Sequence, residues 1–216
     1  MNSSILEVLS NIHNKYIKDL NSIEIFSIKR KNYSRVVIDA YLKSKLGLNL
    51  SQHLKSVGLS LKTCPVSKGG LTPIEPLRLA SLSLASLVNE SWEDTELCKA
   101  LSGIIILPLI VEAKNLGQPF RIVGKAFIWV PSPIEIDGLK SDWVIFKTLA
   151  QKGALPKLRG GKNDSLSFPS EVGTKFIHMK PHSVKGKFEL DSYGREVRKM
   201  AFYLNSAHLR KLILSH

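Results

Sequence analysis

The sequence predicts an α/β fold, in which a mixed central sheet is flanked by helices. Two observations favour this class. Apolar residues alternate or run continuously in several short segments, which is typical of strands, and they recur three or four positions apart in others, which is typical of helices. Because the two kinds of segment are interspersed along the chain, we expect the helices to cover the faces of the sheet.

The N-terminal part of the chain is predicted to begin with two helices, over residues 4–20 and 34–46. Residues 49–55 are interpreted as a connector to a strand over 57–63, where apolar and polar residues alternate. Residues 65–70 contain Pro, Ser and a Gly-Gly pair, and we expect them to turn.

The middle of the chain supplies most of the predicted sheet. The leucine-rich segment 74–88 is assigned to a strand and 93–101 to a helix. The apolar run 103–111 is expected to be a central strand, and 120–130 a further strand that stops at Pro131. The remaining predicted elements are a helix over 142–150, a basic and glycine-rich loop over 154–169, a strand over 175–179, a loop over 180–186, a strand over 200–204 and a helix over 206–214.

The charge of the chain indicates its class of partner. It carries 31 basic and 18 acidic side chains, a net charge of +13, and has a pI near 9.8. Such a balance favours a polyanion, with nucleic acid ahead of an anionic membrane. A general basic binder without sequence preference remains an alternative.

Other classes are disfavoured. Cys64 and Cys98 have neither metal-ligand spacing nor a disulfide framework, the N-terminus lacks a signal-peptide pattern, and the longest apolar run, 104–111, is too short to cross a bilayer. We expect a cytoplasmic protein with reduced thiols, no membrane partner and no small-molecule substrate.

The predicted strand 57–63 carries an incomplete nuclease pattern. Its alternation places Ser60 and Lys62 on the same face. In a metal-dependent nuclease this spacing would read acid-x-Lys, where the acid holds Mg²⁺ and the lysine stabilises the reacting charge. Here the lysine is present and a serine replaces the acid.

Nearby carboxylates offer little compensation. Between positions 25 and 89 the acidic residues are Asp39 and Glu75, and His53 is a nitrogen ligand where Mg²⁺ prefers oxygen. An active Mg²⁺-dependent nuclease is therefore the alternative interpretation, and it requires Asp39 and Glu75 to converge on Lys62.

Several short motifs occur in order along the chain. They are Lys-Asn-Tyr-Ser-Arg at 31–35, Asp-Ala-Tyr-Leu at 39–42, Val-Gly-Leu-Ser-Leu-Lys-Thr-Cys-Pro at 57–65, Trp-Glu at 92–93, Leu-Pro at 107–108, Lys-Pro at 180–181 and Phe-Tyr-Leu at 202–204. In their order and spacing they resemble the motifs of the MutH-type mismatch-repair and GATC restriction endonucleases. The resemblance implies the restriction-endonuclease-like fold, with one domain over residues 1–216 whose two lobes form a DNA cleft.

The resemblance also assigns the catalytic positions. The first metal-binding acid of the family falls on His53 and the second on Ser60, while the catalytic lysine is kept as Lys62. A further acidic position falls on Asp39, and a basic segment falls on 100–103, where no base remains. The implied domain has the fold without the metal site, so it is similar to the C-terminal half of the Sau-three-A-type restriction endonuclease, which binds DNA as an allosteric effector.

The DNA-reading positions of the family are better preserved. Its major-groove loop corresponds to Lys180-Pro181-His182-Ser183, and its adenine-contacting tyrosine to Tyr203. Lys180 can reach guanine or a phosphate, and His182 can donate to guanine N7. The alternatives are core packing for Tyr203 and an ordinary solvated lysine at 180. The predicted phosphate contacts are Arg159, Lys162, Lys185 and Lys187.

These inferences lead to one expectation. The chain should be a catalytically inactive domain that recognises GATC in double-stranded DNA and acts as the allosteric effector of a type II restriction endonuclease in a restriction-modification system. Its partner would be an N-terminal catalytic MutH-like domain. No cofactor is expected for the chain itself, and Mg²⁺ would serve the partner domain. Under the alternative, the chain is an active Mg²⁺-dependent GATC endonuclease or nickase and would use Mg²⁺ itself.

Overall fold

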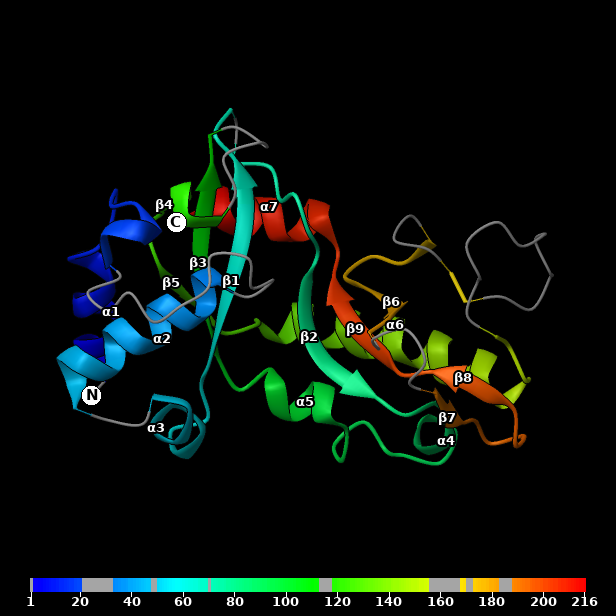
Figure 1. Cartoon of the computed structure of the whole chain (residues 1–216). Coiled ribbons are helices and arrows are strands. Elements are labelled where there is room, and N and C mark those ends of the chain that lie inside the picture. The colour runs from blue at the N-terminus through cyan, green and yellow to red at the C-terminus, as the bar shows by residue number, and fades with distance from the viewer. Residues whose placement is uncertain are drawn as a thin grey trace. The chain divides into compact units, whose positions relative to one another are not determined.

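A computed structural model describes residues 2–20, 33–47, 50–69, 71–112, 118–155, 168–169, 173–182 and 188–216 (Figure 1). The chain divides into two compact units. Unit 1 comprises Met1–Glu75, Gly103–Trp129 and Leu209–His216, and unit 2 comprises Pro76–Ser102 and Val130–His208.

Unit 1 is built on a mixed four-stranded sheet. Its strands are β1 (Ser60–Ser67), β3 (Ile104–Val111), β4 (Ile122–Val123) and β5 (Phe127–Trp129). β1 runs parallel to β3 over its whole length, from the pair Ser60–Ile104 to Ser67–Val111, and Figure 1 shows the two side by side. β4 and β5 both pair antiparallel with β3. The apolar sequence of β3 fits its central place, because a strand covered on both faces exposes no polar side chain.

The helices of unit 1 supply the apolar residues that pack with the sheet in one core. They are α1 (Asn2–Ser10), η1 (Ile17–Leu20), α2 (Tyr33–Leu46), α3 (Leu50–Ser56) and η3 (Gln118–Phe120), and the last residues of α7 (Ser206–Leu214) also belong to this unit. The predicted helix over 34–46 is confirmed. The helix predicted over 4–20 is wrong beyond Ser10, because the chain turns at Asn14, where φ is +64°. The connector predicted over 49–55 is α3.

The predicted strand 57–63 begins later and runs further than expected. Pro65 lies inside β1 instead of starting a turn. It is tolerated because β1 ends the order β1-β3-β4, so the missing N–H of Pro65 can face the open edge. The Pro65 carbonyl accepts a hydrogen bond of 2.8 Å from Ile74 N on that edge.

Unit 2 contains a three-stranded antiparallel sheet in the order β2-β9-β6 and a separate hairpin of β7 and β8. The strands are β2 (Leu77–Leu82), β6 (Ile177–Pro181), β7 (Phe188–Leu190), β8 (Glu196–Arg198) and β9 (Met200–Leu204), and the helices are α4 (Leu84–Leu87), α5 (Glu96–Ala100) and α6 (Pro133–Gln151). The expected strand at 200–204 and the helix at 206–214 are confirmed.

Some predictions for the second half of the chain need correction. The segment 74–88 forms β2 and then α4, and 120–130 contains β4 and β5 instead of one strand. The helix predicted from 142 begins at Pro133, because the Ser132 side chain accepts from Glu135 N while the Glu135 side chain accepts from Ser132 N, a capping box. Lys180 and Pro181 end β6 instead of starting the loop. Most of the predicted loop 154–169 lies outside the described residues.

α6 fixes the start of β6 through a buried carboxylate. Asp142 is 4% exposed and accepts hydrogen bonds from the main-chain N–H groups of Lys175 (3.2 Å), Phe176 (2.6 Å) and Ile177 (3.0 Å). One turn earlier, Gly138 leaves room for the Phe176 ring. Together these contacts determine where β6, and therefore Lys180, lies on the sheet of unit 2.

Both sheets with their flanking helices confirm the predicted mixed α/β class. Among the described residues, no helix is both long enough and apolar enough to cross a bilayer.

Candidate nucleic-acid interface

The β2-β9-β6 sheet has one apolar and one polar face. Phe202, which is 2% exposed, packs its ring 5.6 Å from that of Phe146 on α6. Tyr203 is the next residue of β9, so its side chain points to the opposite face. The alternative that placed Tyr203 in the core beside Phe202 is therefore not what the structure shows, and Tyr203 is partly exposed.

Cations gather around Tyr203 on that second face. Tyr203 lies directly opposite Arg78 of β2 on one side and His178 of β6 on the other, and Lys180 is two residues beyond His178. Directly opposed residues share a face, and so do residues two apart on one strand. Arg78 and Lys180 are exposed, whereas His178 is 1% exposed and stacks on the Tyr203 ring with centroids 5.9 Å apart. We call Arg78, Lys180, His182 and Tyr203 the basic face.

His182 joins this face from just after β6. Its main-chain N–H donates to Lys199 O at 2.7 Å. Its Nε2 contacts Nη1 of Arg78, and its Nδ1 lies 3.4 Å from the Tyr203 hydroxyl. A guanidinium can only donate, so Nε2 accepts and the ring proton of the neutral imidazole lies on Nδ1, toward Tyr203. Before His182 can donate to a guanine, one of these two contacts has to open.

The electrostatics of Tyr203 fit a hydrogen-bonding role. Burial raises the pKa of its hydroxyl, and the neighbouring Arg78 opposes that shift. The phenol therefore keeps its proton at neutral pH. It can donate to an acceptor on a base while Arg78 and Lys180 supply positive charge.

Arg78 is not among the DNA-binding positions that the sequence predicts. Its signal was present, because it is the one cation within the alternating segment Leu77-Arg78-Leu79. Ser183 and the expected phosphate contacts Arg159, Lys162, Lys185 and Lys187 lie outside the described residues.

Unit 1 carries the positions assigned to the metal site. Asp39 lies on α2, His53 on α3, and Ser60 and Lys62 near the start of β1. Ser60 Oγ and Asp39 Oδ1 are buried, and neither has a hydrogen-bond partner among the described residues. The other carboxyl oxygen of Asp39 is 2.8 Å from Nε of Arg35.

Glu75, the second acid of the alternative interpretation, lies further along the sheet. Ile74 N bonds to Pro65 O, so the neighbouring Glu75 is near Pro65. Pro65 is five positions beyond Ser60, which is roughly 16 Å along a strand. Glu75 is exposed on the surface. The geometry does not bring this acid to Ser60.

The donor set does not fit Mg²⁺. A divalent magnesium site requires hard oxygen ligands with anionic carboxylates among them. Asp39 is already paired with Arg35, and Ser60 contributes only a neutral hydroxyl. Across the described part of the chain, no group of three or more His, Cys, Asp or Glu side chains is placed to hold a metal.

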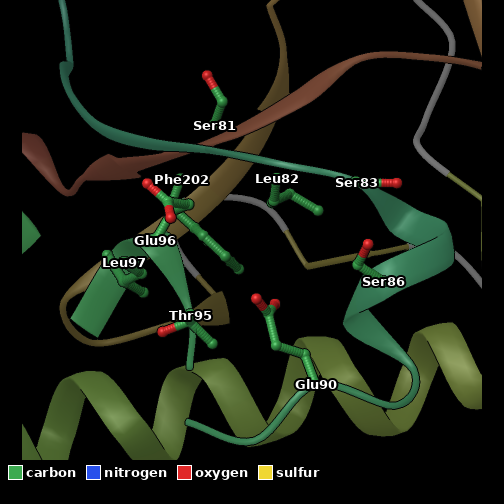
Figure 2. Close-up of a pocket in the computed structure, with 9 residues that line it drawn as sticks. All are labelled: Ser81, Leu82, Ser83, Ser86, Glu90, Thr95, Glu96, Leu97 and Phe202. Atoms are coloured by element: carbon green, nitrogen blue, oxygen red, sulfur yellow. The ribbon is translucent and has the colours of Figure 1, made fainter. Parts of the chain in front are cut away.

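A pocket of about 220 Å³ in unit 2 has the wrong charge for DNA (Figure 2). Figure 2 shows the Glu90 carboxylate pointing into it, and Glu96 lines it as well. Burial raises the pKa of Glu90. An acidic lining repels phosphate, so we place the candidate interface on the basic face and not here.

The fold indicates the structural class of the chain. The mixed sheet flanked by helices is consistent with the restriction-endonuclease-like architecture. Comparison with known proteins then finds a similarity to one family. The profile of the family described as "DNA mismatch repair enzyme MutH" matches residues 42–142, a range that contains Ser60 and Lys62. The chain is therefore similar to the MutH family over this range, which is slightly less than half of its length.

Individual relatives extend this similarity. A DNA mismatch repair protein MutH of Vibrio cholerae is 23% identical over 190 residues, covering 86% of this chain and 80% of that protein. The MutH of Vibrio campbellii is 22% identical and covers 88% and 81%, and that of Shewanella baltica is 25% identical and covers 68% and 66%.

Proposed function

We propose that the chain binds double-stranded DNA through the basic face of unit 2 and does not itself cleave it. The observation that carries this proposal is the gathering of Arg78, Lys180 and His182 around Tyr203 on one sheet face. Cations on an exposed face bind phosphates without reading sequence, and a polar aromatic residue among them can contact a base edge. The net charge of +13 agrees with a polyanionic partner.

The preferred sequence in this proposal is GATC. Support comes from the resemblance, which aligns Lys180, Pro181, His182, Ser183 and Tyr203 with the base-reading positions of the GATC endonucleases. A DNA-binding role also agrees with the cytoplasmic location expected from the two free cysteines.

The absence of cleavage is proposed on chemical grounds. Ser60 is neutral where an acid is needed, and the one carboxylate on the neighbouring helix, Asp39, is paired with Arg35. Metal-assisted cleavage needs ligands that hold the ion against water, and this set is too weak while Asp39 is paired with Arg35. In this proposal the chain is the effector half of a type II restriction endonuclease, and the cleaving half is an N-terminal catalytic MutH-like domain that supplies the Mg²⁺ site.

The alternative function is a MutH-type Mg²⁺-dependent nickase. The observation that favours it is Lys62, which is retained on β1 within the range that the family profile matches. The relatives that are named mismatch repair proteins fit this alternative equally well.

A binding titration tests the proposed function. A labelled duplex with one GATC site and a scrambled duplex of the same composition are titrated with the chain in EDTA, over a series of salt concentrations. We expect a lower Kd for the GATC duplex and a steep loss of affinity with salt, because bound cations displace counterions from phosphates. Equal Kd values would refute sequence preference, and weak, salt-insensitive binding would refute DNA binding itself.

The effector role needs a separate experiment with the tandem enzyme. A DNA-bound effector changes its partner only if the partner contacts differ between the bound and free forms. Substrates with two GATC sites should then be cut faster than one-site substrates, and a short GATC duplex added in trans should rescue the slow substrate. Equal rates, with the added duplex only competing, would make the domain a passive anchor.

A further inference from the structure

A guanidinium in unit 1 joins α2 to β1. Nε of Arg35 lies 2.8 Å from Oδ2 of Asp39, one helical turn further along α2. Nη1 of the same side chain donates a hydrogen bond to the main-chain carbonyl oxygen of Leu61, in the middle of the Ser60-Leu61-Lys62 segment. The Arg35 and Asp39 side chains are only 27% and 37% exposed, so the pair is partly shielded from water.

The Leu61 carbonyl needs this partner because of its place in the sheet. Ser60 N donates to Gly103 O at 3.1 Å, so Ser60 faces the inner neighbour β3. Main-chain groups alternate in direction along a strand, and therefore Leu61 faces the open edge. The bond from Ser67 N to Thr72 O follows the same alternation. Arg35 thus caps an edge carbonyl that no other strand reaches among the residues that the structure describes.

The atoms around Arg35 are those that a metal ion would use. Asp39 offers a carboxylate oxygen and Leu61 a carbonyl oxygen, which are the ligand types of hard divalent cations. The second carboxyl oxygen, Asp39 Oδ1, is buried and has no hydrogen-bond partner within the described ranges, and the same holds for Oγ of Ser60, the residue before Leu61. The Arg35 guanidinium therefore contacts two oxygen atoms, one of Asp39 and one of Leu61, and supplies the positive charge between them.

We propose that the Arg35 guanidinium is the permanent cation of this site, in place of a divalent metal. An arginine side chain stays protonated throughout the range in which proteins are folded, so the charge is always present. A divalent ion would have to displace it from both Asp39 and Leu61. The α2–β1 junction therefore needs no metal, and loss of the guanidinium should leave an oxygen-lined site that accepts one. The proposal concerns unit 1 alone and holds whether or not unit 2 binds DNA.

Thermal unfolding of the full chain tests this proposal. Wild type, Arg35→Gln, Arg35→Lys and the double variant Arg35→Gln/Asp39→Asn are compared in EDTA and in millimolar Mn²⁺ at constant ionic strength. Arg198→Gln, at an exposed position of β8, is the control for loss of one positive charge.

The expected results separate charge from packing. Wild type should have the same Tm in both buffers. Arg35→Gln should unfold about 2–4 °C below Arg198→Gln in EDTA, the shift expected when a contact worth about 1 kcal/mol is lost from a domain of this size, and Mn²⁺ should recover part of this loss. The double variant should show no recovery, and Arg35→Lys, which keeps the charge, should not respond to Mn²⁺.

Several results would overturn the proposal. They are a Tm of Arg35→Gln equal to that of Arg198→Gln, a destabilised Arg35→Gln that Mn²⁺ does not restore, or an Arg35→Lys variant that responds to Mn²⁺. Calorimetric titration of Mn²⁺ into the wild-type chain adds a test that does not depend on any variant folding. Stoichiometric binding by wild type that Asp39→Asn abolishes would show that a metal occupies the site after all.

Discussion

The hydroxyl oxygen of Tyr203 lies 3.4 Å from Nδ1 of His182, on the polar face of the β2-β9-β6 sheet. The other ring nitrogen of His182 contacts Arg78, so the histidine connects a phenol and a guanidinium from two adjacent strands. A substitution at any one of these positions will change how the other two are held. This coupling makes the basic face testable one residue at a time.

Removal of the Tyr203 hydroxyl should reduce sequence preference without unfolding the chain. In Tyr203→Phe the ring can keep its stacking on His178, whereas the polar group is lost. We expect the difference in binding free energy between the GATC and scrambled duplexes to shrink by roughly 1–3 kcal/mol. The Tm of the chain should be nearly unchanged. Titration of both duplexes measures this. An unchanged Kd ratio would remove Tyr203 from the reading positions.

Lys180→Ala and His182→Ala should have the same effect as Tyr203→Phe, each through one lost base contact. Arg78→Ala should also reduce the preference for the GATC duplex over the scrambled one, because His182 then loses the partner of its Nε2. Arg198→Ala is the control for charge. If Arg78→Ala weakens both duplexes equally, as the control does, Arg78 binds a phosphate and does not position His182.

The expected phosphate contacts should behave differently from the basic face. Arg159→Ala and Lys162→Ala should raise the Kd of the GATC and scrambled duplexes by similar factors. Each should also reduce the magnitude of the negative slope of log K against log salt concentration by about one. A salt series on both duplexes provides the measurement, and a selective loss on the GATC duplex would mean that these residues read sequence.

Gly138→Ala should destabilise unit 2, although alanine is the better helix former by about 1 kcal/mol. A Cβ at position 138 would lie 2.0 Å from Cε2 of Phe176. Phe176 is 6% exposed and has little room to move, so we expect overpacking to cost about 1–3 kcal/mol. The exposed Ser141→Ala on the same helix should be close to neutral. Thermal unfolding of the two variants decides the matter, and a Gly138→Ala chain as stable as wild type would show that the ring shifts freely.

Cys64 should be unreactive until the chain unfolds. Burial raises the pKa of its thiol to about 12, and the side chain is 1% exposed. An unfolded thiol ionises near pH 8.5. The unfolded state therefore loses this proton first as the pH rises, and the contribution to stability is present below about pH 8.5 and lost between there and about pH 12.

Two measurements check this prediction. Alkylation of the native chain should label the partly exposed Cys98 and spare Cys64. Cys64→Val should weaken the alkaline fall in the free energy of unfolding. Rapid labelling of Cys64 in a native Cys98→Ser variant would contradict its burial.

Regular periodicity explains which parts of the fold the sequence could predict. The helix at 34–46, the central strand at 103–111 and the strand at 200–204 have strong patterns, and the structure confirms them within about a residue. The pattern does not predict α3, because a helix of seven residues spans only two turns and shows little apolar periodicity. The early start of α6 was missed because Pro131-Ser132-Pro133 was interpreted as a stop, when Ser132 is the N-cap and Pro133 the first helical residue.

The candidate site was less predictable than the fold. Lys180, His182 and Tyr203 came from a family resemblance, whereas their meeting with Arg78 depends on the strand order β2-β9-β6, which no local pattern encodes. The pairing of Arg35 with the Leu61 carbonyl likewise depends on β1 being an edge strand. Residues that are distant in sequence meet only through this topology, and a single sequence does not specify it.

The central claim is that the chain binds a GATC duplex and leaves it intact, and one assay measures both. A labelled GATC duplex is incubated with wild type in Mn²⁺, and bound and cleaved DNA are separated from the same tube, with Lys62→Ala and the double variant Ser60→Glu/His53→Asp alongside. We predict saturable retention of uncut DNA by wild type and by Lys62→Ala. The double variant restores the two missing acids, so cleavage by this variant would be compatible with the claim. Site-specific cleavage by wild type that disappears in Lys62→Ala would contradict the claim and establish the nickase.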